Sequence, residues 1–194
     1  GGLKGKKIAF VHIDSPFGKE PIELLNKVAE TKGFEVKLFP YPVPGTEQAA
    51  TWSEVRRYRA DKVIIWGAGP GQGVSIRGAV TNGIPAKDVH SVIWLSESDM
   101  QSFKGKEVVG VKRFTAVNTG VDLPILKRIT EKVVNPGNGS GDKKRVGWSY
   151  YNIGVASMAI AVEAAKLALK NFGEPLTGEK LKKGFELLKG FDAE

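Results

Sequence analysis

Short apolar runs alternate with longer segments of helical periodicity over the first 117 residues. The apolar runs are rich in branched and aromatic side chains, as buried strands are, and they occupy residues 7–13, 34–39, 62–66, 91–95 and 107–117. Between them, apolar residues recur at helical spacing in residues 17–32, 47–60 and 71–82, with a short helical turn near residues 98–103. Four or five such repeats predict an α/β fold, a parallel sheet flanked by helices on both faces.

The pattern changes after Asn118-Thr119-Gly120. No further strand is indicated, and residues 122–134, 149–172 and 177–188 have the spacing of three helices. We therefore expect an α/β domain over residues 4–117 and a separate helical segment over residues 118–194.

The middle helix of this segment is apolar on every face between Ile153 and Val162. A helix of that kind has to be covered on all sides, and residues 119–194 offer no sheet to cover it. We expect either self-association through residues 150–165 or a covering sheet that is missing from this chain. Because Glu163 and Lys166 follow at once, no apolar stretch reaches the roughly 20 residues of a bilayer span, and no spanning helix is expected.

Composition places the chain among globular proteins, with 41% hydrophobic and 26% charged residues in 194. The net charge of +8 is spread along the chain, and its densest clusters, residues 56–59 and 143–145, are short. A nucleic-acid surface needs a concentrated basic face, so solvated helix ends are the favoured interpretation and no nucleic-acid partner is expected. Cysteine is absent, which excludes disulfides and thiolate chemistry.

Catalytic and cofactor motifs fail on spacing. Residues 67–73 are glycine-rich but do not fit G-x-G-x-x-G, and residues 137–144 do not fit a phosphate loop. Two histidines without suitably spaced carboxylates build no metal site, and G-x-S-x-G does not occur. His12 lies beside Asp14 and Ser15, but adjacent residues of a strand point to opposite faces, so a hydrogen-bonded strand-end histidine is favoured. We expect no enzyme, no metal and no cofactor.

Three loops at predicted strand ends carry the candidate site. They are residues 14–18, 67–70 and 96–99, and parallel sheets bind ligands outside the carboxyl ends of their strands. Ser15 is a plausible N-cap with Pro16 at the first helical position, so the backbone N–H groups of Phe17 and Gly18 would face an anion such as a carboxylate.

Each remaining candidate has a structural alternative. Phe17 offers an aromatic surface or packs onto the helix below it. Glu97 accepts an ammonium or hydroxyl group or takes part in capping a helix. Gly67 and Gly69 allow close approach of a ligand or serve only the turn.

Several stretches, in this order and spacing, carry a resemblance to a known family. They are Leu3–Phe10 followed by Phe17-Gly18-Lys19, then Trp94–Asp99, Tyr150–Val155, Val162–Ala165 and Phe172–Gly178. Together they resemble the type I periplasmic solute-binding proteins of branched-chain amino acid ABC transporters, the leucine/isoleucine/valine-binding family.

The resemblance implies a protein of two lobes with a solute clamped between them. Residues 4–117 would be the second lobe and the helices from residue 118 onward part of an incomplete first lobe, so the chain is expected to be a piece of a longer protein. The ligand-binding residues implied at the three loops are Ser15, Phe17, Gly18, Gly67, Ala68, Gly69, Pro70, Ser96 and Glu97.

The implied function is the periplasmic or extracytoplasmic binding component of an ABC importer, with a membrane permease as partner. Phe17 stands where the amino-acid binders tend to have tyrosine, and Gly69-Pro70 replaces an aromatic. Hydrophobic or aromatic carboxylates therefore compete with leucine-like amino acids as the solute. The alternatives are the ligand-sensing domain of a receptor or transcription regulator of the same fold and, third, an α/β enzyme.

Overall fold

The structure is a computed structural model that describes residues 2–192. The chain divides into two compact units, Gly1–Thr115 and Ala116–Glu194, and each is described by itself.

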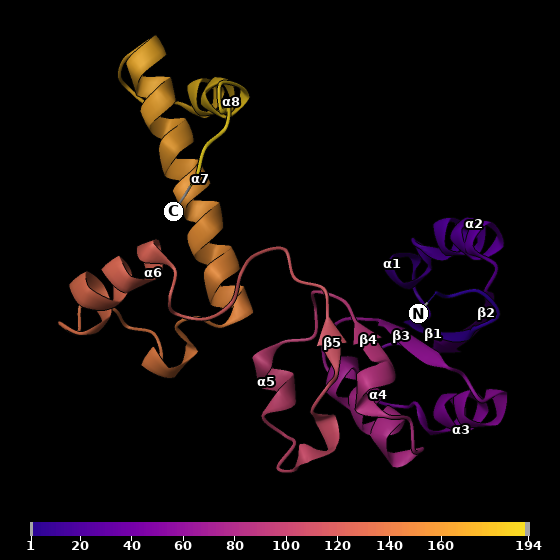
Figure 1. Cartoon of the computed structure of the whole chain (residues 1–194). Helices are drawn as coiled ribbons and strands as arrows, with labels where there is room; N and C mark the ends of the chain where they lie inside the picture. The colour runs from indigo at the N-terminus through magenta and orange to yellow at the C-terminus, as the bar shows by residue number, and fades with distance from the viewer. Residues whose placement is uncertain (1, 193–194) are drawn as a thin grey trace. The chain divides into compact units, whose positions relative to one another are not determined.

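The first unit is built on one sheet of five parallel strands in the order β2-β1-β3-β4-β5 (Figure 1). The strands are β1 (Lys7–Ile13), β2 (Glu35–Tyr41), β3 (Lys62–Trp66), β4 (Val89–Ser91) and β5 (Lys112–Arg113). From β1 the chain passes first to β2 on one side and then back to β3 on the other side, so the direction in which strands are added to the sheet reverses between β1 and β3. Such a reversal leaves the carboxyl ends of β1 and β3 open to a ligand.

Helices cover both faces of this sheet, which confirms the predicted fold class. On one face, α3 (Ala49–Tyr58) and α4 (Gly71–Thr81) bury Trp52, Val55, Ile76 and Ala79 against alternate residues of β1 and β3. On the other face, α2 (Ile22–Lys32) follows the short α1 (Pro16–Lys19) and packs Ala29 against Ile8. The central strand β1 is buried on both of its faces because helices cover it on both.

The second face is incompletely covered over β3 and β4. A hollow of about 690 Å³ lies there, and its lining includes Ile64, Trp66, Val92, Trp94 and Phe114.

Three sequence predictions for this unit were wrong in detail. The strand expected over residues 91–95 is β4, Val89–Ser91, and the chain then turns because Leu95 N–H donates to Val92 O. Of the one or two strands expected over residues 107–117, only the short β5 is present, preceded by a 3-10 turn at Lys106–Val108. The helix expected over residues 17–32 is two helices, since Pro21, the N-cap of α2, cannot donate the hydrogen bond that would continue α1.

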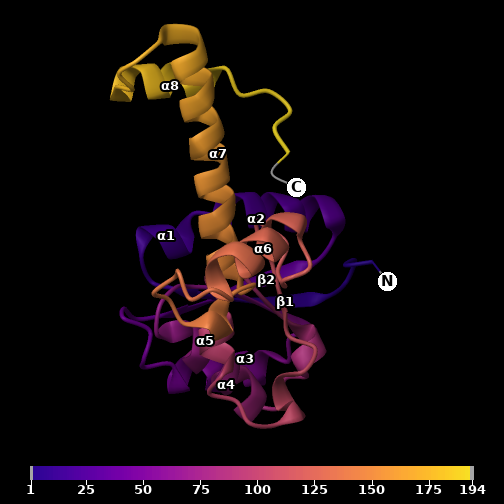
Figure 2. The ribbon, with the colours of Figure 1, turned by 90° about the vertical axis from the view of Figure 1, so that its left-hand side faces the viewer.

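The second unit is helical. It contains α6 (Pro124–Ile129) continued by a π-helical turn (Thr130–Val134), then α7 (Ser149–Phe172) and α8 (Gly178–Glu186). Figure 2 shows α8 beside the far end of α7. At this crossing a Cβ on Gly184 would lie 2.1 Å from Ala164 O, and Ala164 and Ala168 are fully buried. Small residues thus allow the two helices to approach closely.

Helix α7 contradicts the expectation that the chain has no helix able to span a membrane. It is 24 residues long and contains an 18-residue stretch with a mean hydropathy of 1.4, so by length and composition it could cross a membrane. Only 17% of that stretch is buried, and Met158 and Val162 are 62% and 49% exposed. A groove of about 810 Å³ runs along this helix between α6 and Phe191.

Candidate functional site

The three predicted loops follow strands that are neighbours in the sheet, and we call this region the carboxyl edge. Residues 14–18 follow β1, residues 67–70 follow β3, and residues 96–99 follow β4 after the turn at residues 92–95. Aromatic rings connect them: the Phe17 centroid lies 6.2 Å from that of Trp66 and 6.3 Å from that of Trp94. The structure therefore brings the last residue of β3 and the turn after β4 together around Phe17, while Glu97 lines a separate hollow beside Arg113.

The first loop is fixed by its own hydrogen bonds. Ser15 is the N-cap of α1, and its Oγ accepts from Gly18 N–H at 3.2 Å. The Gly18 N–H that was predicted to face an anion thus has a partner within the loop. Gly18 is buried, and a Cβ there would lie 1.7 Å from Ile13 O, so this position requires glycine for packing.

Asp14 and Lys19 form an exposed ion pair at 2.6 Å across the same loop. The hydrogen bond from Lys19, and then its charge, lower the pKa of Asp14.

The glycine-rich loop contains one packed glycine and one open glycine. A Cβ on Gly67 would lie 1.9 Å from the Tyr41 hydroxyl oxygen, whereas Gly69 has a φ of +65° and no atom within 4 Å of an added Cβ. Gly69 and Pro70 are exposed and Ala68 is half-buried. Gly67 therefore accommodates Tyr41, and Gly69 is the glycine that a ligand can approach.

Tyr41 fills the space behind this loop. Burial raises the pKa of its hydroxyl, and only Ser75 acts in the opposite direction. Its oxygen nevertheless has no partner of hydrogen-bond geometry among residues 2–192.

Two buried glutamines, which the sequence analysis missed, hold the glycine-rich loop. Gln72 Nε2 donates to Gly67 O, and its Oε1 accepts from Ser91 Oγ at 3.2 Å. Gln48 Nε2 donates to Gly71 O at 3.0 Å, and its Oε1 accepts from Trp52 Nε1 at 2.9 Å. Polar residues inside predicted helices give no periodic signal, so the sequence could not have marked them.

The third loop begins with a capping box. Ser96 Oγ donates to Asp99 Oδ2 at 2.7 Å, and Ser96 N–H donates to the same oxygen at 2.8 Å at the start of α5 (Glu97–Met100). Ser96 is 8% exposed. Its role in the structure is thus to begin α5.

The Glu97 carboxylate forms an ion pair with an arginine side chain of the same unit. Arg113 Nη2 lies 2.6 Å from Glu97 Oε1 and Nη1 lies 3.4 Å from Oε2, a bidentate pair. Arg113 Nη1 also donates to Leu95 O at 2.6 Å. Arg113 is a third residue that the sequence analysis missed.

His12 is a buried histidine at the end of β1. Its Nδ1 donates to Ile13 O at 3.1 Å, and its ring stacks on Phe10 at 5.3 Å. The prediction of a hydrogen-bonded strand-end histidine is confirmed. Beside it in the sheet, Trp66 has a buried Nε1 for which the described residues supply no acceptor.

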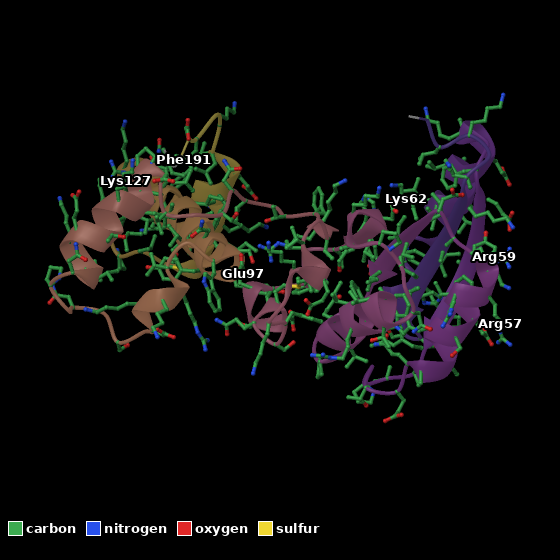
Figure 3. The ribbon with its side chains drawn as sticks, turned by 60° about the horizontal axis from the view of Figure 1, so that its bottom comes forward. Arg57, Arg59, Lys62, Glu97, Lys127 and Phe191 are labelled. Carbon is green, nitrogen blue, oxygen red and sulfur yellow. The ribbon has the colours of Figure 1, made fainter. Side chains whose placement is uncertain are left out.

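The described part of the chain contains no cluster of metal ligands, and two arginines of the basic cluster at residues 56–59 lie away from Glu97. No group of three histidine or carboxylate residues within residues 2–192 could hold a metal ion. Arg57 is 77% exposed and lies 3.9 Å from Glu54, and Arg59 ends α3 in the left-handed conformation. Figure 3 shows both arginines on the opposite side of the first unit from Glu97.

Comparisons with known proteins bear on this unit and on the helices after it. A family model described as a periplasmic binding protein matches residues 1–193. No curated protein matches the chain. A solved structure from the Pseudomonas fluorescens group, described as an ABC transporter permease, is 35% identical with a TM-score of 0.83, covering 96% of this chain and 45% of that one.

Two further structures share the fold at 21% identity. One is a fatty acid ABC transporter substrate-binding protein from Thermomonospora curvata, with a TM-score of 0.73, covering 94% of this chain and 46% of that one. The other is a branched chain amino acid ABC transporter from Thermus thermophilus with bound valine, with a TM-score of 0.72, covering 93% and 47%. The chain thus spans about half the length of the structures it matches.

Proposed function

This chain belongs to the periplasmic binding protein family, and we propose that it forms part of the extracytoplasmic solute-binding component of an ABC importer. The observation that carries the proposal is the carboxyl edge itself. Phe17 packs there against Trp66 and Trp94, and Trp66 directly precedes the glycine-rich loop that carries the exposed Gly69, at the end of a parallel sheet where ligands bind.

We propose a small carboxylate-bearing solute, either a hydrophobic amino acid or an aromatic acid. A fatty acid and valine are named for two of the structures that share the fold, and both carry a carboxylate. The residues proposed to contact it are Phe17, Ala68, Gly69, Pro70 and Glu97. Ser15, Gly18, Gly67 and Ser96 act in our proposal by shaping the loops, because each is engaged within the unit.

The whole protein would have two lobes. We propose that residues 4–117 form one lobe and that residues 118–194 belong to the other. The family structures are about twice as long as this chain, and α7 has a largely exposed apolar surface. Both facts support a second sheet that covers α7 in the complete protein and closes over the carboxyl edge by hinge motion.

The proposed role is non-enzymatic: the closed protein would deliver its solute to a membrane permease in the periplasm or outside the cell. The Glu97 carboxylate is paired with Arg113 and His12 is buried, and we assign neither of them a catalytic role.

A thermal-shift screen of the full-length protein against aliphatic, branched and aromatic carboxylates and amino acids tests this function, followed by calorimetric titration. We expect at least one solute with a Kd of about 1 μM, corresponding to about −8 kcal/mol. The isolated chain of residues 1–194 should bind it at roughly millimolar or worse, since it would lack one wall of the cleft.

Phe17→Ala should weaken this binding, and Phe185→Ala is the matched control because Phe185 is a 43% exposed aromatic in the other unit. Micromolar binding by the isolated chain, or an unchanged Kd in Phe17→Ala, would contradict the proposal.

A further inference from the structure

We infer that the solute of this site is an aromatic or bulky apolar carboxylic acid without an α-ammonium group. The inference rests on the proposed function and decides between the two solute classes left open there.

The first argument is that Glu97, the candidate partner for an ammonium group, is held by an arginine. The two terminal guanidinium nitrogens face its two oxygens, at 2.6 and 3.4 Å, and the side chains of Arg113 and Glu97 are only 19% and 27% exposed. Arg113 is fixed in turn by Leu95 O at 2.6 Å. A bidentate pair of this kind neutralises the carboxylate, so an incoming ammonium would meet a pair with no net charge.

The second argument is that the other carboxylates of the three loops are engaged as well. Asp14 is paired with Lys19 at 2.6 Å, and Asp99 accepts from the Ser96 hydroxyl and N–H at 2.7 and 2.8 Å. An ammonium group that loses water needs a charged or strongly polar acceptor in exchange. Within this chain, an ammonium group at the carboxyl edge would have to share a carboxylate that already has a partner.

The third argument is the apolar surface that the same edge presents. Phe17 lies edge-on to Trp94, with an interplanar angle of 82°, and it also contacts Trp66. Trp94 is 43% exposed, so a ring of the solute can extend this cluster. Aromatic pairs add roughly threefold to tenfold in affinity beyond the apolar area that they bury.

Matched solutes test the inference in the full-length protein. L-Phenylalanine and 3-phenylpropionate differ only in the α-ammonium group, as do L-leucine and 4-methylpentanoate. In calorimetric titrations at pH 7 we expect each ammonium-free acid to bind at least tenfold more tightly than its amino acid, and 3-phenylpropionate to bind more tightly than 4-methylpentanoate.

Two outcomes separate this inference from the proposed function. An amino acid that binds at micromolar Kd, as tightly as its ammonium-free analogue or more so, overturns the inference and leaves the proposed function standing. Absence of binding by all four solutes, together with no stabilisation by any member of the wider carboxylate and amino acid panel, overturns both.

Variants test which residues are responsible for the expected preference among the four solutes. Trp94→Ala should raise the Kd of 3-phenylpropionate threefold to tenfold and change the Kd of 4-methylpentanoate by less than twofold. Phe185→Ala should change neither Kd. Arg113→Met should reduce the ratio between the Kd of each amino acid and the Kd of its ammonium-free analogue, because it removes the positive charge that is paired with Glu97. Arg113→Lys should restore part of that ratio. Equal losses for both acids in Trp94→Ala, or an unchanged preference in a folded Arg113→Met, would overturn the assignment of these roles.

Discussion

Replacing Gly67 by alanine tests whether this glycine serves packing or solute approach. The added Cβ would lie 1.9 Å from the Tyr41 hydroxyl oxygen and 3.2 Å from its Cζ. Tyr41 is 1% exposed, so its ring cannot move away without opening the core. Gly67 is not in the left-handed region, so no backbone strain is added. Overpacking costs about 1–3 kcal/mol, and contact with a fully buried ring places Gly67→Ala near about 3 kcal/mol.

The double variant Gly67→Ala/Tyr41→Phe separates the hydroxyl clash from other effects. Without the hydroxyl, the nearest atom is Cζ at 3.2 Å, so we expect at least about 2 kcal/mol of the loss to be recovered. Tyr41→Phe alone should be neutral or stabilising, because the hydroxyl is buried and none of the described residues accepts or donates to it.

Urea unfolding followed by tryptophan fluorescence gives these free energies, and solute titration of the same variants gives affinity. Gly69→Ala is the control: it should cost about 1 kcal/mol through its φ of +65° and should not respond to Tyr41→Phe. If Gly67→Ala is within about 0.5 kcal/mol of the parent protein but binds solute more weakly, the packing explanation is refuted and a contact role is supported.

Three further predictions concern other parts of the chain. Ser96→Ala removes the capping box and should lower the free energy of unfolding by about 1 kcal/mol, while Ser98→Ala, exposed on the same short helix, should have little effect; equal effects would contradict the capping role. In an NMR pH titration the Asp14 carboxyl should show a pKa below its ordinary 3.8, and Lys19→Met should raise it. Because the pKa of Asp14 is lower in the folded than in the unfolded protein, the Asp14–Lys19 pair stabilises the fold above about pH 4, and this stabilisation is lost as the pH falls through the pKa of the folded protein. An unchanged Asp14 pKa in Lys19→Met would contradict the role of this pair. The isolated chain should self-associate through residues 150–165, measured by light scattering, and Met158→Lys should reduce the association while Leu24→Lys, at a similarly exposed position in the first unit, does not; a monomer at all concentrations would refute this.

The elements with long, continuous signals could be predicted from the sequence. β3 and α7 were predicted at their observed bounds, Lys62–Trp66 and Ser149–Phe172, because the first is an apolar run that follows one lysine and ends at Gly67 and the second is a long helical pattern ended by Gly173. β4 was misplaced because its own residues include His90 and Ser91, whereas the more apolar residues after it form a turn. Short strands that depend on their neighbours leave little local pattern.

The candidate site was predictable only where its chemistry is local. Ser15 before Pro16 indicates a helix start from adjacent residues, as does Ser96 three positions before Asp99. The pair between Glu97 and Arg113 spans 16 positions and depends on the position of β5 beside β4. The contacts of Phe17 with Trp66 and Trp94 likewise depend on the order of the strands, which no local pattern specifies.

The amide groups of Gln48 and Gln72 have a consequence for how solutes could be distinguished. Their hydrogen bonds connect the glycine-rich loop to α3, α4 and β4. A loop fastened in this way loses little conformational entropy when a solute arrives. The same hydrogen bonds keep the loop from changing shape around a poorly fitting solute. A change of solute during evolution would then proceed by substitution of the aromatic side chains beside the loop, while the loop backbone keeps its conformation.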